Sequence, residues 1–317
     1  MRRILANPLC EDDLARRRTP PSRAVLETVS RMAPLLRVFA REGDRLWSPA
    51  PMESIPDGQR PILESGPLRD LPPAEEVLAW CETPEAAAHR RGPRSSAVSW
   101  DAPLHELLWT LPVPSPSVVA AVHHRAFHLQ VAKEIGCDLP GARMVESLAK
   151  LERLPLPRSW VLKAPLSASG RSRYIERNGP ELSDPKARRT VERLFARHGP
   201  LLFEPWMDRV ADYGVSALLT ETDLRIVGIH GQRVDLKGQF AGIDLQPDLS
   251  EEDRARLLET VEAVAAALRR AGYVGPFGID AWSYRKEDGT IALNPLGEIN
   301  ARMTFGLVAW AERGRTL

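Results

Sequence analysis

The sequence predicts an α+β fold for the part of the chain after residue 116. Short apolar runs typical of strands mix there with amphipathic helical segments, without the strict alternation of a parallel α/β protein. Pro112, Pro114 and Pro116 precede this region and mark a connector in which neither a helix nor a central strand persists. We therefore expect two domains, residues 1–116 and residues 117–317.

The first of these regions contains two recognisable elements. Residues 4–6 are apolar and are expected to form an opening strand, and residues 23–41 carry apolar side chains at helical spacing. Pro, Arg and acidic residues dominate from there to Trp100.

The second region has a sharper pattern. Ser117 is expected to cap a helix that runs to Ile135 and ends at Gly136, and Ser250 is expected to cap a helix that ends before Gly272. A further helix is expected at 184–198, and strands at 160–165, 201–206, 213–219 and 224–230.

Composition excludes several classes of protein. The 317 residues carry a net charge of +1, which gives no electrostatic case for nucleic acid or an anionic membrane surface. The apolar start ends almost at once in acidic residues, so we expect no signal peptide and no membrane span. Cys10, Cys81 and Cys137 are far apart and are expected to be free thiols of a reducing compartment. The cytoplasm is the expected location.

The most informative feature is a pair of segments near the C-terminus, 278–280 (GID) and 297–302 (GEINAR). Residues two apart on a strand face the same way, so Glu298 and Asn300 should point together, and Asp280 on a neighbouring strand could join them. Carboxylate and amide oxygens suit a hard cation such as Mg²⁺. Isolated acidic residues at strand ends are common, so the metal site is one of two interpretations at this point.

The register of this hairpin decides whether the three side chains meet. A two-residue turn at 288–289 would pair Asp280 with Gly297, which leaves Glu298 on the wrong face. The metal site therefore requires a bulge in the second strand, and Asn294-Pro295 is the expected place because Pro cannot donate to the ladder. A three-residue turn would change this count.

Three upstream segments carry weaker signals. Lys163 ends an apolar strand and precedes a loop of small and basic residues, 167–173, whose backbone amides could cradle phosphate; a solvent-exposed Lys beside an ordinary loop is the alternative. Residues 204–207 (EPWM) follow a strand and could meet an adenine edge, with Asp212 left for a ribose, or could form an ordinary crossing loop.

Other chemistries have less support. His124 and His128 are one helical turn apart, but no third zinc ligand and no HExxH pattern accompany them. The sequence contains no Walker A, GxSxG or GxGxxG motif.

From Val122 onward the chain resembles the ATP-grasp superfamily of ATP-dependent carboxylate ligases. Its members carry, in order, an early basic residue, a strand Lys, a small-residue phosphate loop, an adenine hinge that opens with Glu, a ribose acid, a strand acid and a final ExNxR. The matching positions are Arg125, Lys163, residues 167–173, residues 204–207, Asp212, Asp280 and residues 298–302.

The resemblance implies a fold of two α+β subdomains with ATP between them, preceded by a small α/β domain in residues 1–116. It implies that Asp280, Glu298 and Asn300 hold one or two Mg²⁺ ions, with Mn²⁺ as an alternative. It implies that Arg302 faces the γ-phosphate or an acyl phosphate. The implied nucleotide contacts are Arg125, Lys163, Ser169, Gly170, Arg171, Glu204, Trp206, Met207 and Asp212.

One departure from the family pattern adds two candidates. Gly278 stands where some relatives carry an Arg, two residues before the strand acid. Arg233 and Lys237 could replace that Arg at the substrate or intermediate, or could belong to a solvated loop.

The implied activity is a ligase that activates a substrate carboxylate as an acyl phosphate and joins it to an amine or thiol. A phosphotransferase and a non-catalytic nucleotide-binding protein on the same fold are the alternatives. We expect small-molecule carboxylate and amine substrates, no nucleic acid or membrane partner, and leave a homodimer open.

Overall fold

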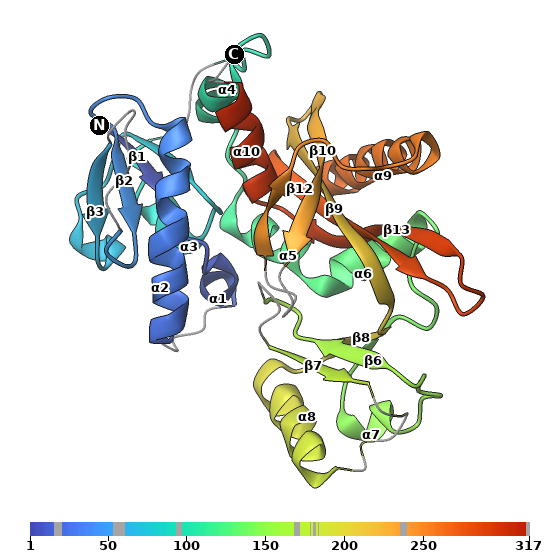
Figure 1. The fold of residues 1–317 in the computed structure, drawn as a ribbon. Helices are drawn as coiled ribbons and strands as arrows, with labels where there is room; N and C mark the ends of the chain where they lie inside the picture. The colour runs from blue at the N-terminus through green and yellow to red at the C-terminus, as the bar shows by residue number, and fades with distance from the viewer. Residues whose placement is uncertain are drawn as a thin grey trace.

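A computed structural model of the chain describes residues 1–15, 21–52, 61–92, 97–167, 172–177, 179, 182, 184–234 and 240–314. Figure 1 shows three groups of strands, each accompanied by helices. Within the described residues these strands form one parallel sheet near the N-terminus and two antiparallel sheets after it.

The first sheet has the order β3-β2-β1-β4 and consists of β1 (Arg2–Leu5), β2 (Arg45–Ser48), β3 (Ile62–Ser65) and β4 (Glu76–Ala79). Its strands are parallel, so helical segments must cross between them. The described helical segments between strands are α1 (Cys10–Leu14), α2 (Arg23–Met32) and the 3-10 segments η1 (Ala33–Phe39) and η2 (Leu68–Asp70), while α3 (Pro84–Ala88) follows β4. The α/β character implied for this region is confirmed, while the helix expected over 23–41 changes to a 3-10 helix at Ala33.

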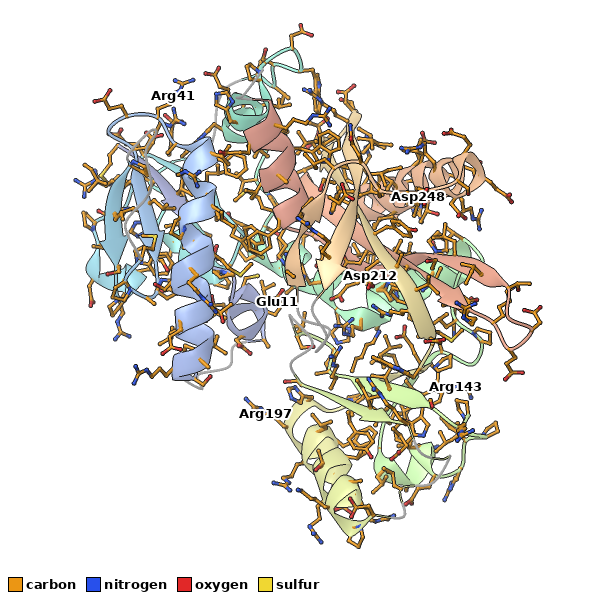
Figure 2. All side chains as sticks on the ribbon, in the orientation of Figure 1. Glu11, Arg41, Arg143, Arg197, Asp212 and Asp248 are labelled. Atoms are coloured by element: carbon orange, nitrogen blue, oxygen red, sulfur yellow. The ribbon has the colours of Figure 1, made fainter. Side chains whose placement is uncertain are left out.

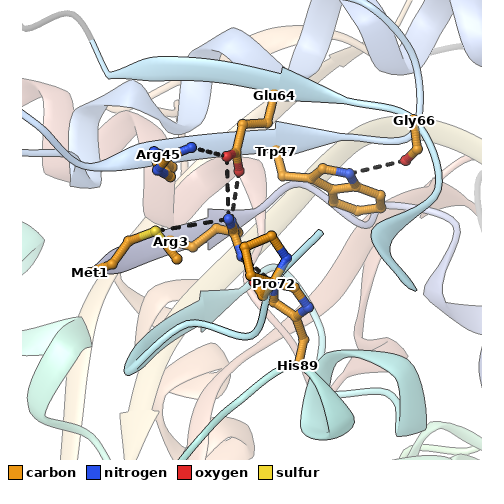
Figure 3. Close-up of polar contacts among 8 residues, drawn as sticks. All are labelled: Met1, Arg3, Arg45, Trp47, Glu64, Gly66, Pro72 and His89. Carbon is orange, nitrogen blue, oxygen red and sulfur yellow. Dashed lines mark hydrogen bonds and ion pairs between the residues drawn. The ribbon is translucent and has the colours of Figure 1, made fainter. Parts of the chain in front are cut away.

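A buried ion pair ties this sheet together (Figure 3). Arg3 on β1 is fully buried, and its Nε donates to Glu64 on β3 at 2.6 Å. Arg45 on the intervening strand pairs with the same carboxylate, and Arg3 also donates to the Pro72 carbonyl at 2.7 Å. A buried charge needs such partners, so these contacts link β1 with β3 across β2.

The helix expected over 117–135 is two helices, α5 (Pro116–His123) and α6 (Arg125–Glu134), preceded by α4 (Leu104–Thr110). Ser115, not Ser117, caps α5, because Pro116 occupies the first helical turn. His124 has an extended ψ of 131°, which ends α5, and its ring accepts a hydrogen bond from the Ala126 amide at 3.1 Å to cap α6.

The smaller antiparallel sheet has the order β5-β8-β6-β7. It contains β5 (Arg143–Val145), β6 (Trp160–Lys163), β7 (Arg173–Glu176) and β8 (Leu201–Pro205). The helices α7 (Leu148–Leu151) and α8 (Pro185–His198) accompany it, and they share a separate apolar cluster with the sheet.

The larger antiparallel sheet has the order β11-β10-β9-β12-β13. Its strands are β9 (Asp208–Leu219), β10 (Leu224–Val234), β11 (Phe240–Asp244), β12 (Gly275–Arg285) and β13 (Ile291–Asn300). Helices α9 (Glu251–Arg270) and α10 (Phe305–Arg313) pack on it. Ser250 caps α9 through the Asp253 amide, as predicted.

The β12–β13 hairpin differs from the register that the sequence predicts. Its turn has three residues, since Lys286 and Thr290 share a hydrogen bond and Gly289 takes a positive φ of 84°. Trp282 pairs with Asn294, but Asp280 pairs with Glu298, so β13 carries a bulge between these two pairs. The pairing of Asp280 with Gly297 is therefore wrong, whereas the bulge lies where the metal hypothesis required it.

A continuous apolar core joins the first sheet to the larger antiparallel sheet. Ile4 and Leu78 belong to the same buried cluster as Val215 and Ile279. The boundary expected after residue 116 stays a prediction. Cys10, Cys81 and Cys137 are free, as expected. None of the helices in the described ranges is long and apolar enough to cross a membrane.

The bulge brings Gly297 against the Trp282 ring, where an added Cβ would lie 1.5 Å from Cζ3. We expect Gly297→Ala to lower the free energy of unfolding by about 1–3 kcal/mol, because the strand or the indole must move. Urea denaturation measures this change. Gly92→Ala is the control, since no heavy atom lies within 4 Å of its added Cβ; equal stability of the two variants would contradict the tight contact.

Candidate active site

A cavity lies between the smaller antiparallel sheet and one face of the larger one. Lys163 at the end of β6 reaches it from the first, and residues of β9, β10, β12 and β13 reach it from the second. Asp212 on β9 is among them, and Figure 2 shows it near the place where the two sheets approach. The lining residues are Lys163, Arg209, Asp212, Tyr213, Gln232, Asp280, Ala281, Trp282, Gly297 and Glu298.

Two carboxylates stand directly opposite each other in this cavity. Asp280 and Glu298 are cross-strand partners, and Asn300 donates to Asp280 Oδ2 at 3.1 Å. Gln232, from β10, donates to Asp280 Oδ1 at 2.8 Å. The structure therefore brings together the three side chains that the sequence places on one face, and it adds a glutamine.

The electrostatics of this pair favour a cation. Burial and the negative charge of Glu298 raise the pKa of Asp280 to about 6, although the two amide hydrogen bonds act in the opposite direction. Burial also acts to raise the pKa of Glu298, but Arg125 and Lys163 lower it on balance. A divalent cation between the carboxylates would offset their repulsion, and the oxygen ligands are those that Mg²⁺ takes. The residues present thus fit a magnesium ion bound with phosphate oxygens.

Lys163 and Glu204 form a buried ion pair on the opposite wall. They lie on neighbouring strands, β6 and β8, on the face that carries Val161 and Leu202. Burial lowers the pKa of Lys163. Burial acts to raise the pKa of Glu204, but Lys163 and neighbouring His128 lower it, so the carboxylate stays charged. Lys163 also lies 5.9 Å from the Trp282 ring, which directs the ammonium toward the cavity.

Arg125 joins this wall to the carboxylates. It is 7% exposed, and its Nε donates to the Ala164 carbonyl at 3.0 Å. Its Nη2 lies 3.2 Å from Glu298 Oε1 and donates to the Ser167 carbonyl at 3.4 Å. Nη1 is buried and has no hydrogen-bond partner in the described structure. A buried guanidinium with an unused donor beside a carboxylate pair is suited to an anion such as phosphate.

The segment after β8 has its own contacts. The Trp206 amide donates to the Ser159 carbonyl at 2.9 Å, and the indole lies 5.3 Å from the guanidinium of Arg177. Met207 packs with a small apolar cluster that includes Trp282. Asp212 accepts from Arg209 at 3.0 Å, so its carboxylate is restrained within the cavity lining.

Arg302 extends from the end of β13 toward the first sheet. Its Nε donates to Glu11 on α1 at 3.2 Å, and its guanidinium lies 5.6 Å from the Trp80 ring. Burial acts against its charge, but Glu11 and Glu298 contribute to raising its pKa above the ordinary value. Arg302 thus interacts electrostatically with Glu298 of the cavity and with Glu11 of the N-terminal region.

The remaining sequence candidates fall outside the cavity or outside the described residues. Arg233 follows Gln232 on β10 and faces the other way, against Gly242 of β11, so it does not reach the cavity. Ser169, Gly170, Arg171 and Lys237 lie outside the described residues.

Several cavity residues carried no recognisable sequence signal. Gln232 and Arg209 belong to the site because of sheet register, which a single sequence does not reveal. His124 caps α6 and does not pair with His128 around a metal. Among the described residues, no group of three or more His, Cys, Asp or Glu side chains is arranged for a metal. A cation here would depend on two carboxylates, an amide and phosphate.

No protein-family model matches the chain. Among curated proteins it is 29% identical over 147 residues to the [butirosin acyl-carrier protein]–L-glutamate ligase of Niallia circulans. The matched part covers 45% of this chain and 33% of that protein, so the likeness spans about a third of the relative's length.

Solved structures match over nearly the whole chain. Biotin carboxylase from Campylobacter jejuni, in a complex with a β,γ-ATP ligand, gives a TM-score of 0.58 at 13% identity and covers 100% of this chain and 71% of its own. N5-carboxyaminoimidazole synthetase from Staphylococcus aureus gives 0.55 at 8% identity, covering 96% and 70%. L-amino acid ligase from Bacillus licheniformis gives 0.50 at 16% identity, covering 95% and 66%. The ATP-grasp fold expected from the resemblance is confirmed.

The buried Lys163–Glu204 pair should contribute to the stability of the folded protein in a way that mutation can measure. Glu204→Gln leaves a buried ammonium without its counter-charge and should lower the free energy of unfolding by about 3–5 kcal/mol. Lys163→Met combined with Glu204→Leu should cost less than the sum of Lys163→Met alone and Glu204→Leu alone, because both charges then leave the interior; these three variants and the wild type form the cycle. Chemical denaturation of the four proteins gives the coupling.

Glu152→Gln is the matched control, since the pair between Glu152 and Arg188 is exposed on the same subdomain and should matter little. Additive losses at positions 163 and 204 would contradict the buried pair.

Proposed function

We propose that this protein is an ATP-dependent ligase that joins a substrate carboxylate to an amine or thiol. The observation that carries the proposal is the pairing of Asp280 with Glu298, which share one cavity with Lys163, while Arg125 contacts Glu298. Such a site can hold a magnesium-bound polyphosphate between a carboxylate wall and a basic wall.

The proposed reaction has two steps. The substrate carboxylate attacks the γ-phosphorus of ATP, and the bond between that phosphorus and the β,γ-bridging oxygen breaks. The products of this step are ADP and an acyl phosphate. The amine then attacks the acyl carbon, phosphate leaves with the electrons of the C–O bond, and the nitrogen releases a proton to give the amide. Both steps place negative charge on oxygen atoms, so catalysis rests on positioning and on cationic groups. No nucleophile from the protein is required.

Roles for individual residues follow from where they lie. Lys163 and the unused Nη1 of Arg125 would bind phosphate oxygens. Backbone groups of residues 204–207 would meet adenine, and Asp212 would accept from the ribose. Bound Mg²⁺ would supply charge neutralisation at the phosphates, held by Asp280, Glu298 and Asn300.

The substrate end of the site would lie at Arg302, which we propose binds the acyl phosphate. Because Arg302 contacts Glu11, residues 1–116 would form the domain that completes this end, before a catalytic domain in residues 117–317. The curated relative is named for L-glutamate and one structural match for L-amino acids, so amino acids are the first carboxylates to test.

The first test is release of ADP and phosphate with a panel of amino acids, each with and without amines. Release that requires a carboxylate and an amine, with an amide detected by mass spectrometry, supports the ligase. A stable phosphorylated product would instead indicate a phosphotransferase. Tight MgATP binding without any release would indicate a non-catalytic nucleotide-binding protein.

The carboxylate pair gives a sharper prediction. Glu298→Ala should abolish ADP release and remove the stabilisation of the folded protein by MgATP, which is roughly 2.7 kcal/mol at a hundredfold excess over Kd. Thermal unfolding with and without MgATP measures the second effect independently of turnover, and EDTA should reproduce it in the wild type.

Glu287→Ala, at the exposed turn of the same hairpin, is the control and should behave as wild type. Normal turnover by the Glu298→Ala variant would eliminate the assignment of this carboxylate to the metal.

A further inference from the structure

Glu11 is a buried acid on a helix that accompanies the first sheet, and it has no catalytic role in the function proposed above. It lies on α1, the short helix after β1, and is only 4% exposed. Helix α1 packs against α5, and Figure 2 labels Glu11 in this region, between the first sheet and the rest of the chain. The neighbouring titratable groups are Cys10, Asp13, Cys81, His123 and Arg302.

One oxygen of Glu11 has a partner and the other has none. Oε1 accepts from Arg302 Nε at 3.2 Å. Oε2 is buried and has no hydrogen-bond partner in the described structure. A buried carboxylate oxygen without a donor costs free energy, which a ligand carrying N–H groups would recover.

The other acids at the site are already engaged. Both oxygens of Asp280 accept hydrogen bonds, Glu204 is paired with Lys163, and Asp212 with Arg209. Glu298 is paired with Arg125. Glu11 differs from these acids because it has a buried oxygen without a partner among the described residues and contacts Arg302.

We infer that Glu11 binds the attacking substrate as an ammonium ion and takes a proton from it. This rests on the proposed function, because it assumes that Arg302 holds the acyl phosphate. The two oxygens of one carboxylate are close together, so a group on Oε2 lies beside the guanidinium that Oε1 contacts. Glu11 would thus place a primary amine next to the acyl carbon.

Amide formation from the ammonium ion and the acyl phosphate requires the removal of two protons from the nitrogen. The ammonium gives one proton to Glu11 Oε2 and becomes a neutral amine. Its nitrogen bonds to the acyl carbon, the C–O bond to phosphate breaks, and phosphate leaves with that electron pair. The second proton passes from nitrogen to the departing phosphate, and Glu11 returns its proton to solvent.

A comparison of two nucleophiles distinguishes removal of a proton by Glu11 from a role in which Glu11 only positions Arg302. Hydroxylamine is mainly unprotonated at neutral pH, so it traps an acyl phosphate as a hydroxamate without needing a base. A larger fraction of glycinamide is protonated at this pH, so glycinamide must lose a proton before it can attack. With an amino acid that supports ADP release, we expect Glu11→Gln to lower amide formation from glycinamide about 100-fold. Hydroxamate formation should stay close to that of the wild type.

Glu11→Asp keeps the charge beside Arg302 but withdraws the carboxylate by one methylene. It should also lose amide formation selectively, and it preserves the test if the Gln variant does not fold. Glu85→Gln is the matched control, since Glu85 is an exposed acid on neighbouring α3 and should leave both products unchanged.

Equal losses of hydroxamate and amide would assign Glu11 to holding Arg302 and would overturn the inference. Unchanged amide formation in both Glu11 variants would overturn it as well. A wild-type protein that makes neither product with any carboxylate would overturn the proposed function, and this inference with it.

Discussion

The bulge in β13 is the constraint on which the candidate site depends. Without it, the three-residue turn would set Glu298 out of register with Asp280, and the carboxylates would not be cross-strand partners. The Trp282 ring packs against the bulge and occupies the space beside Gly297 where any side chain would stand. The register that places Glu298 opposite Asp280 is therefore compatible only with glycine at position 297.

Three pairs of opposite charge surround the candidate site. Glu204 pairs with Lys163, Arg125 with Glu298, and Arg302 with Glu11. Each pair joins different elements, and all of the side chains but that of Glu298, which is 35% exposed, are largely buried, so the pairs orient side chains that would be costly to bury alone. Among the described residues, Arg125 keeps a buried donor and Glu11 a buried acceptor without a partner, which suit ligands of opposite charge.

The sequence predicts the types of the elements well where a local signal exists. Ser250 caps α9 as expected, and the strands around residues 213–230 pair across their turn. It fails where the answer depends on tertiary packing. The cap of α5 is a different case, because Pro116 at the first helical position is a local signal that favours Ser115 over Ser117. Gln232 enters the site through strand order, which no local pattern encodes.

The contact of Arg302 with α1 has a consequence for the modularity of the protein. Trp80 and Glu11 both come from the first sheet's region, and the Met303 amide also donates to the Trp80 carbonyl. A chimaera that exchanged this region for that of another protein would remove the two side chains that restrain Arg302 from outside the larger sheet. To keep Arg302 in place, the incoming segment would have to supply an acid and an aromatic ring at the same two positions.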